Sequence, residues 1–453
     1  MSSAAGKFDG CATMASIFIT ILQNEALTAR LLEAVLHADR GLGSLSWLAR
    51  TCKALRDPAL TLLWRDLNSF EPLVTLFPQT KSRVFGSMRQ KDWDRILGYG
   101  SRVRSISYID SGTPSTLFDL LEKHTNGPDH IMPNLTSLSY QSTYPPKSKH
   151  CTLLLGPKVQ TLNVKVQWMR YSTLVAWRNV SASAPAHNLK SLSSLSIEVS
   201  GLYNFYALIK DVPPSEVALE HLSLVSAKGI EPDPLFMLWV ADLPKLHTLG
   251  LAVKYGNVSA SAAVEYHRNT YDTIPEPTSS MRTSESHVPD VKIPKFGRLR
   301  KVRLIGTRTD CLVFLRDLSG PQLHHVELEL VPAESDLDWH RMCIALRMHC
   351  SSSLHTLRIH SPHVGYVQEP IQLEIWQLGP LPHLRCLEID LPDVIFNDSS
   401  IVDLTVAIPS LEEIRLAPFM RFPHQGTEMY RFTWLYSERD SLTPSEMYKA
   451  IKD

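Results

Sequence analysis

From Leu135 onward, one hydrophobic pattern recurs along the chain: apolar-x-x-apolar-x-apolar, where x is mostly polar or small. The ten copies are "LTSLSY" at Leu135, "VQTLNV" at Val159, "LSSLSI" at Leu192, "LEHLSL" at Leu219, "LHTLGL" at Leu246, "LRKVRL" at Leu299, "LHHVEL" at Leu323, "LHTLRI" at Leu354, "LRCLEI" at Leu384 and "LEEIRL" at Leu411. The alternation at the end of each copy predicts a short strand with its apolar side chains facing an interior and the x positions facing outward. No single repeat buries its own apolar side, so neighbouring repeats must cover one another.

The spacing of the copies indicates which kind of repeat this is. Subtracting successive first positions gives 24, 33, 27, 27, 53, 24, 31, 30 and 27 residues. Most values lie at or just above the range of about 20–29 residues that is typical of a leucine-rich repeat. A Pro or a polar turn precedes many copies, as in "IMPN", "DLPK" and "PLPH", and ends the previous element before the strand begins.

Apolar segments between the copies, such as "PLFMLWVADL" and "DWHRMCIALRMHC", predict helices on the other side of the strands. The expected fold class is α/β, with a small N-terminal helical bundle followed by a leucine-rich-repeat solenoid. Its parallel strands would form the concave face, with helices and turns outside. At 453 residues the chain exceeds what one hydrophobic core usually serves, which agrees with a repeat architecture.

The 53-residue spacing contains a segment of different composition. Residues 255–294 are rich in Ser, Thr, Pro and Ala and poor in large aliphatic side chains. Burial in such a segment does not offset the entropy lost on ordering, so we expect a mobile insertion. It is interpreted either as a phosphorylation or partner-binding loop or as a tolerated insertion.

Before the repeats, the pattern has helical spacing. The segment "ALTARLLEAVLHA" (26–38) predicts a first helix, ended by Gly41 and Gly43, and "SLSWLARTCKAL" (44–55) predicts a second. Asp57 and Pro58 predict the start of a third helix, with Asp57 as N-cap and Pro58 at the first helical position. A bundle this small usually needs a partner or an attached domain to cover it.

Composition excludes several classes of protein. There are 46 basic and 46 acidic residues, so no net charge marks a nucleic-acid or membrane-surface protein. The seven cysteines are scattered and include no C-x-x-C pair, which indicates reduced thiols in a cytoplasmic or nuclear protein. The apolar stretch "ATMASIFITIL" (12–22) lacks a clearly positive segment before it and is interpreted as a tail leading into a helix, in preference to a signal peptide.

The segment "SLSWLARTCKALRDPALTLLWRDLNSFEPLVTLFP" resembles the F-box region of F-box proteins with C-terminal leucine-rich repeats, particularly a fungal group. The resemblance covers about residues 26–78 closely and the rest of the chain only as repeat architecture. It departs from the family in the first helix, because the Leu-Pro pair that commonly opens an F-box is absent.

The resemblance implies a function. In that family the F-box docks on the Skp-type adaptor of an SCF ubiquitin ligase, which also contains a cullin, and the repeats hold the substrate protein. The implied adaptor-binding residues are Leu31, Leu32, Leu45, Leu48, Leu55, Pro58, Leu60 and Trp64. For each of these positions the alternative is a place in the bundle's own core.

The repeats suggest where a substrate protein would bind. The outward strand positions line the concave face, and the candidate substrate-binding residues are His247, Arg303, His325, Arg358, Glu388 and Arg415. The mixed charge of this face suits a protein or peptide better than a nucleic-acid backbone, which requires a basic stripe. The alternative is that most of these positions are ordinary solvated strand residues.

The sequence gives no sign of catalysis or of a cofactor. It contains no phosphate-binding glycine loop, no H-E-x-x-H and no metal-spaced Cys/His cluster. His324 and His325 are adjacent on a predicted strand and are expected to face opposite sides, which disfavours shared metal ligation. We therefore expect a non-catalytic substrate receptor that uses no cofactor and binds neither nucleic acid nor membrane.

Two alternatives remain: a leucine-rich-repeat scaffold whose N-terminal helices only cap the repeats, and an enzyme whose site is assembled from distant residues. The expected organisation is a tail at 1–25, an F-box-like domain at 26–78, and a linker with the first repeat cap at 79–130. The solenoid at 131–420 and a C-terminal cap or tail at 421–453 complete the chain.

Overall fold

The structure is a computed structural model of the whole chain. It describes residues 20, 23–76, 90–110, 130–142, 156, 158–166, 191–200, 212–227, 229–230, 234–254, 296–318, 322–331, 339–350, 352–361, 371–372, 378, 381–391, 394–395, 403–404, 406–416 and 430–433. The predicted insertion at 255–294 lies outside these residues, as do residues 1–19 and most of the predicted C-terminal segment. The described residues fall into two compact units, one up to Lys165 with Ser191, the other comprising Val166 and the residues from Leu192 onward.

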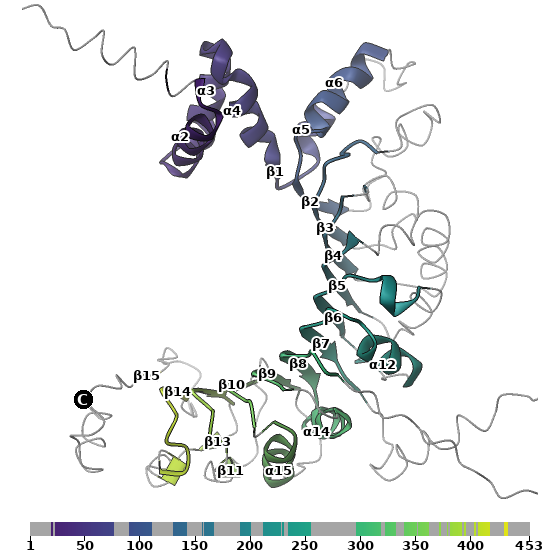
Figure 1. Ribbon diagram of the computed structural model, residues 1–453, viewed down its shortest axis with the longest axis vertical. Coiled ribbons are helices and arrows are strands. Elements are labelled where there is room, and N and C mark those ends of the chain that lie inside the picture. Colours follow the sequence, from purple (N-terminus) through teal and green to yellow (C-terminus); the bar gives the residue numbers. More distant parts are fainter. Residues whose placement is uncertain are drawn as a thin grey trace, which may run out of the picture. The chain divides into compact units, whose positions relative to one another are not determined.

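The first unit begins with three helices that pack on one another (Figure 1). They are α2 (Glu25–His37), α3 (Gly41–Thr51) and α4 (Lys53–Arg65). The Asn24 side chain caps α2 by accepting a hydrogen bond from the Leu27 N–H, 3.1 Å away. The predicted bundle of three helices is therefore present, and its core is made of Leu32, Leu45, Ala49, Leu55 and Ala59.

The boundaries of the second and third helices differ from those predicted. Gly41 does not end a helix but begins α3, and Arg40 before it adopts the left-handed backbone conformation with φ 60°. Helix α4 starts at Lys53, so Pro58 lies inside the helix and Asp57 is not its N-cap. Asp57 instead forms an ion pair with Arg102, whose Nη2 lies 2.9 Å from its Oδ1.

The rest of the first unit starts the parallel sheet. Its elements are β1 (Asp66–Leu67), α5 (Glu71–Val74), α6 (Gln90–Gly100), β2 (Ser105–Asp110), β3 (Ser137–Ser142) and β4 (Thr161–Val166), whose last residue belongs to the second unit. Strand β1 pairs with β2, and β2 with β3, both in parallel. The sheet therefore begins before Leu135, where the first repeat was identified in the sequence.

The second unit continues the repeat pattern. Its strands are β5 (Ser194–Val199), β6 (His221–Ser226), β7 (Thr248–Ala252), β8 (Lys301–Gly306), β9 (His325–Leu330), β10 (Thr356–His360), β12 (Cys386–Asp390), β14 (Glu413–Leu416) and β15 (Tyr430–Thr433). They are hydrogen-bonded in this order, all in parallel except β14 with β15, which is antiparallel. Two short strands, β11 (Ile371–Gln372) and β13 (Val394–Ile395), form a separate parallel pair.

Helices lie on one side of these strands (Figure 1). They are η1 (Pro214–Glu216), α12 (Pro234–Ala241), α14 (Arg308–Asp317) and α15 (Trp339–Cys350). Both segments that were predicted to be helical, "PLFMLWVADL" and "DWHRMCIALRMHC", contain helices, and the predicted α/β fold class is confirmed. The helices α2–α4 pack together, and the parallel strands form a repeat solenoid of the leucine-rich type.

The repeat has a regular backbone connection. Along most of the sheet, the carbonyl group of the residue before a strand accepts two N–H groups from the next repeat. The oxygen of His247, for example, accepts from Arg300 and Lys301, each at 2.9 Å. The oxygen of Arg300 accepts from His324 and His325 at 2.8 and 3.0 Å. These bonds fix the register of neighbouring repeats, and the pattern positions Leu323, Val326 and Leu328 are each at most 1% exposed.

Three of the cysteines pack as small hydrophobic residues. Cys311 lies in α14 and Cys343 and Cys350 lie in α15, and all three are buried free thiols. Burial raises the pKa of the Cys343 and Cys350 thiols to about 12, and it also raises the pKa of Cys311. None of the described helices is long and apolar enough to cross a membrane.

Candidate functional site

Two surfaces are candidates for protein binding, and each is described within its own unit. The first is the outer surface of the helical bundle α2–α4. Four large hydrophobic side chains are exposed there: Leu27 and Leu31 on α2, with exposed fractions of 43% and 37%, and Leu42 and Trp47 on α3, with 62% and 65%. Leu27 and Leu31 lie four residues apart and therefore on the same side of α2.

The eight implied adaptor-binding residues divide into two groups in the structure. Leu32, Leu45 and Leu55 are at most 1% exposed and form the bundle core, so these three positions are corrected from surface to core. In so small a bundle the inward-facing leucines are needed to hold the helices together. The remaining positions are accessible to different degrees: Leu31 is exposed, and Leu48, Pro58, Leu60 and Trp64 are half-buried.

Trp64 has a partner inside the first unit. Its indole ring lies 4.6 Å from the ring of Tyr99 on α6, measured between centroids, at an interplanar angle of 43°. Next to this contact, Arg102 donates to the Asp57 carbonyl at 3.1 Å and to the Thr61 hydroxyl at 2.8 Å. Helix α4 is thus attached to α6 and the start of the sheet by an aromatic contact and an arginine. Trp47 and Leu42, which the resemblance did not single out, are far more exposed than Trp64.

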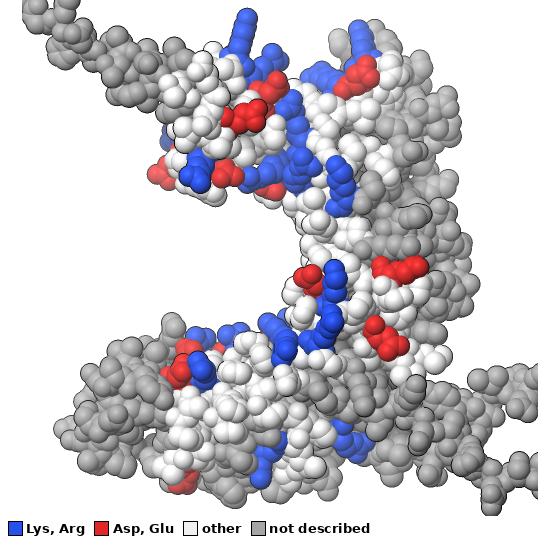
Figure 2. Space-filling view, in the orientation of Figure 1, with Lys and Arg blue, Asp and Glu red and all other residues white. Residues whose placement is uncertain are grey.

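The second candidate surface is the strand face, which we define as the outward positions of strands β5–β14. Basic and acidic side chains both occur on the described part of the molecule, and neither sign covers it alone (Figure 2). On β5–β7 the middle outward positions are small: Ser196, Ser223 and Gly250 are aligned by the strand register. A Cβ at Gly250 would lie 3.0 Å from the Ser223 hydroxyl, so the two strands leave little room between them at this position.

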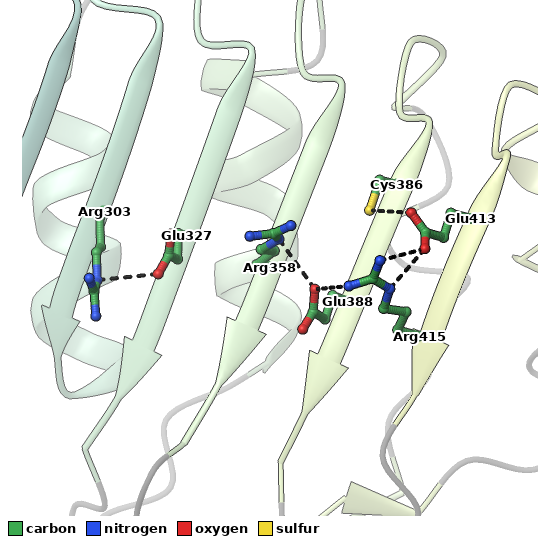
Figure 3. Close-up of polar contacts among 7 residues, drawn as sticks. All are labelled: Arg303, Glu327, Arg358, Cys386, Glu388, Glu413 and Arg415. Atoms are coloured by element: carbon green, nitrogen blue, oxygen red, sulfur yellow. Dashed lines mark hydrogen bonds and ion pairs between the residues drawn. The ribbon is translucent and has the colours of Figure 1, made fainter. Parts of the chain in front are cut away.

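From β8 onward the same register position is charged, and the sign alternates from strand to strand. The row is Arg303, Glu327, Arg358, Glu388 and Arg415. These side chains project from the same face of neighbouring strands, with the helices behind the strands (Figure 3). Opposite charges on neighbouring strands stabilise the sheet modestly, by roughly 0.2–1 kcal/mol for each pair.

Ion pairs join most of the neighbouring residues of the row. Arg303 Nε lies 3.2 Å from Glu327 Oε1, and its Nη2 lies 2.7 Å from Glu329 Oε2. Glu388 accepts from both neighbouring strands, with Arg358 Nε 3.2 Å and Arg415 Nη1 3.5 Å from its Oε2.

At the end of the row, Arg415 also pairs with Glu413, whose Oε1 lies 2.7 Å from Nη2, and this hydrogen bond raises the pKa of Arg415. Glu413 accepts a longer contact from the Cys386 thiol at 3.6 Å. Burial, followed by the charge of Glu413, raises the pKa of Cys386, so this thiol is a poor nucleophile at neutral pH.

The six predicted substrate-binding residues all lie in strands of the second unit or immediately before them. His247, Arg303, His325 and Arg358 are exposed, and Glu388 and Arg415 are half-buried. Arg303, Arg358, Glu388 and Arg415 share the charged row, whereas His247 precedes β7 and His325 begins β9. The structure thus separates these residues into a charged row and an edge at the start of the strands.

The two adjacent histidines, His324 and His325, do not both lie in a strand as predicted. Strand β9 begins at His325, so His324 lies in the turn before it and the strict alternation of a strand does not apply to the pair. His324 is half-buried and His325 is exposed. The described residues include no group of three or more His, Cys, Asp or Glu side chains placed to hold a metal ion.

Sequence reasoning missed that the histidines of different repeats come together. The His324 and His355 rings lie 5.0 Å apart between centroids, and those of His355 and His383 lie 6.4 Å apart. A signal was present in the sequence, because Leu-His occurs at the same position of three repeats, at His247, His324 and His355.

Comparison of the chain with protein-family models and with curated proteins finds no match.

Proposed function

We propose that the protein is a substrate-recognition subunit of an SCF-type ubiquitin ligase. The bundle α2–α4 would dock on the Skp-type adaptor, which is bound to the cullin, and the strand face would hold a substrate protein. The observation that carries the proposal is the exposure of Leu31 and Trp47 on a three-helix bundle whose sequence resembles an F-box. Aromatic and aliphatic anchors of this kind supply most of the binding free energy in protein interfaces.

The proposed mechanism needs no catalytic group in this chain. A receptor that holds a substrate next to a ubiquitin-conjugating enzyme raises the effective concentration of a substrate lysine at that enzyme. The mixed charge of the strand face supports a protein or peptide as the substrate, because charge complementarity gives specificity and speeds association. This function places the protein in the cytoplasm or nucleus, where the ligase acts.

Co-expression of the full chain with a Skp-type adaptor and a cullin tests the proposal. Size-exclusion chromatography with mass determination should show one stoichiometric complex of the three proteins. Elution of this chain as a folded protein that retains neither adaptor nor cullin would refute the proposal.

A second candidate function is a repeat scaffold whose helical bundle only caps the solenoid. The contact of Trp64 with Tyr99 and the bonds of Arg102 favour it, because they attach α4 to α6 as a cap would be attached. This alternative predicts a stable monomer after expression alone and no adaptor binding. The co-expression experiment separates the two functions.

A further inference from the structure

One stretch of the helical bundle carries three basic side chains and no acidic one. It runs from Gly41 to Arg56 and covers α3 and the first turn of α4. Its charged residues are Arg50, Lys53 and Arg56, and all three side chains are exposed. We define these three residues as the cationic rim.

The cationic rim lies beside an exposed aromatic residue. Trp47 is 65% exposed, and Arg50 follows it by three positions on α3, so the two side chains are neighbours on the helix surface. Lys53 and Arg56 stand in the same relation on α4. The two helices meet at Cys52, whose backbone is extended, with φ −119° and ψ 113°. An apolar anchor and three cations therefore occupy the junction of α3 and α4.

Contacts within the chain do not neutralise these cations. In the part of the chain that the structure describes, no carboxylate lies within 4.0 Å of the charged groups of the cationic rim. Arg65, at the other end of α4, pairs with Glu33 at 3.2 Å and with Asp66 at 2.8 Å. Asp57, which follows the rim directly in the sequence, pairs with Arg102. The acidic residues around α4 are thus engaged with other arginines.

Two of the cations occupy an unfavourable position in their own helix. Lys53 is the first residue of α4 and Arg56 completes its first turn, where the helix dipole presents partial positive charge. Helix α4 has no acidic residue in this turn, and Cys52 before it supplies no side-chain cap. The two basic side chains therefore do not stabilise α4. A carboxylate supplied by a partner would offset their repulsion.

The size of the cationic rim restricts the class of partner. A nucleic-acid backbone is bound by a long basic stripe. Recognition of anionic lipid commonly uses clusters of about four to eight basic residues. The rim has only three, next to the exposed indole of Trp47. An aromatic anchor with charges at its edge is typical of a protein interface, in which the peripheral charges steer association.

We propose that the face of the bundle around Trp47 binds an acidic protein surface, whose carboxylates meet the cationic rim and speed the encounter. The inference rests on the proposed function and describes the partner at that same site: the Skp-type adaptor would present carboxylates beside the pocket that receives Trp47. It can fail while the ligase assignment holds, because the adaptor can bind through the apolar side chains alone.

The test measures the association rate constant of the full-length protein with a purified Skp-type adaptor by stopped-flow fluorescence. It is carried out at about 0.1 M and about 1 M salt, where the screening lengths are about 10 and 3 Å. The rim variant is Arg50→Gln/Lys53→Gln/Arg56→Gln. The matched control removes three exposed cations outside the bundle, in Lys91→Gln/Arg95→Gln/Lys245→Gln.

Far-UV circular dichroism and thermal unfolding verify that all three proteins are folded. The rim variant should unfold at the same temperature as the wild type or at a higher one, because the repulsion at the start of α4 is removed. If it is unfolded, Arg50→Gln alone takes its place, with association slowed by about threefold at the lower salt concentration.

At the lower salt concentration, the rim variant should associate with the adaptor about fivefold more slowly than the wild type, or slower still. The control variant should stay within about twofold of the wild type. At the higher salt concentration all three proteins should associate at similar rates, because the charges are screened.

Equal rates for the wild type and the rim variant at the lower salt concentration, or equal slowing in the control variant, would overturn this inference and leave the ligase assignment intact. A folded wild type that does not bind the adaptor would overturn both. Co-sedimentation of the wild type with phosphatidylserine vesicles, lost in the rim variant, would assign the rim to a membrane surface and also overturn the inference.

Discussion

Trp64 and Tyr99 lie with their ring centroids 4.6 Å apart and join the helical bundle to the helix that leads into the sheet. This contact gives Trp64, which the resemblance places at an interface with another protein, a partner within the chain, although its side chain is only half-buried. It leaves the exposed Trp47 and Leu31 as the bundle's strongest candidates for partner binding.

The aromatic contact should be visible as an energetic coupling. In a double-mutant cycle, Trp64→Ala and Tyr99→Ala should each destabilise the protein, and their effects should fall short of additivity by roughly 0.5–1.5 kcal/mol. Urea unfolding followed by far-UV circular dichroism measures the four free energies. Strictly additive effects would show that the two rings do not stabilise each other.

The start of α3 requires a glycine at position 41, and Gly43 in the same helix serves as its matched control. A Cβ at Gly41 would lie 2.1 Å from the Leu36 carbonyl oxygen and 2.5 Å from that of Val35, whereas nothing lies within 4 Å of a Cβ at Gly43. Gly41→Ala should therefore destabilise the protein by about 2 kcal/mol or more, because the atoms in the way are backbone. Gly43→Ala should leave stability unchanged or raise it by up to about 1 kcal/mol.

Thermal and urea unfolding of both glycine variants check this prediction. A Gly41→Ala protein as stable as the wild type would contradict the close approach of α2 to the start of α3.

Glu388 holds two arginines from the strands on either side, Arg358 and Arg415. Glu388→Gln leaves the two cations facing a neutral side chain and should destabilise the protein by about 1 kcal/mol, since these pairs are only partly buried. Removing one of the cations as well, in Glu388→Gln/Arg358→Gln, should restore part of the loss.

The salt dependence provides the control for the charged row. The effect of Glu388→Gln on the free energy of unfolding should shrink in about 1 M salt, where the screening length is only about 3 Å. An effect that is independent of salt would indicate lost packing rather than lost charge pairing.

Arg300 lowers the pKa of His324, after the larger effect of burial. Arg300→Gln should therefore raise the pKa of His324, and titration of the histidine Cε1–H signals by NMR measures the change. Arg385→Gln, which removes the cation immediately before β12, is the control. An unchanged or lower His324 pKa in Arg300→Gln would contradict the effect of Arg300 on His324.

The same shifts give the sign of the pH dependence of stability. The folded-state pKa values of His324 and His325 are lowered, so below the unfolded value of about 6.5 the unfolded chain binds more protons than the folded one. Their contribution to stability is present above that pH and is lost as the pH falls through the folded-state values. As the pH is lowered, the free energy of unfolding, measured with urea, should fall less in His324→Gln than in the wild type.

The solenoid could be predicted because its signal repeats. Leu323, Val326 and Leu328 follow the same pattern as the other copies, and period-2 alternation is the property that a strand imposes on sequence. The earliest strands escaped recognition although "VRSISY" at Val103 fits the pattern, with Val103 and Ile106 at most 1% exposed.

Helix boundaries in the bundle were harder to predict. Asp57 and Pro58 have the residue types of a helix start, but the helix is continuous from Lys53 to Arg65, and Asp57 pairs with Arg102, 45 positions away. Spacing along a helix likewise shows which leucines share a side but not whether that side meets the bundle core or solvent. The contact of Arg300 with His324 could not be predicted either, because it depends on the register of neighbouring strands.

The most direct measurement of the central claim is the dissociation constant of the full-length protein for a purified Skp-type adaptor, compared between the wild type, Leu31→Ala/Trp47→Ala and Met348→Ala. Met348 is 74% exposed on α15 and serves as a matched exposed hydrophobic residue away from the bundle. Loss of an anchor worth about 2 kcal/mol or more should weaken binding by roughly thirtyfold in the bundle variant only. Failure of the folded wild type to bind the adaptor, or equal binding by all three proteins, would contradict the account.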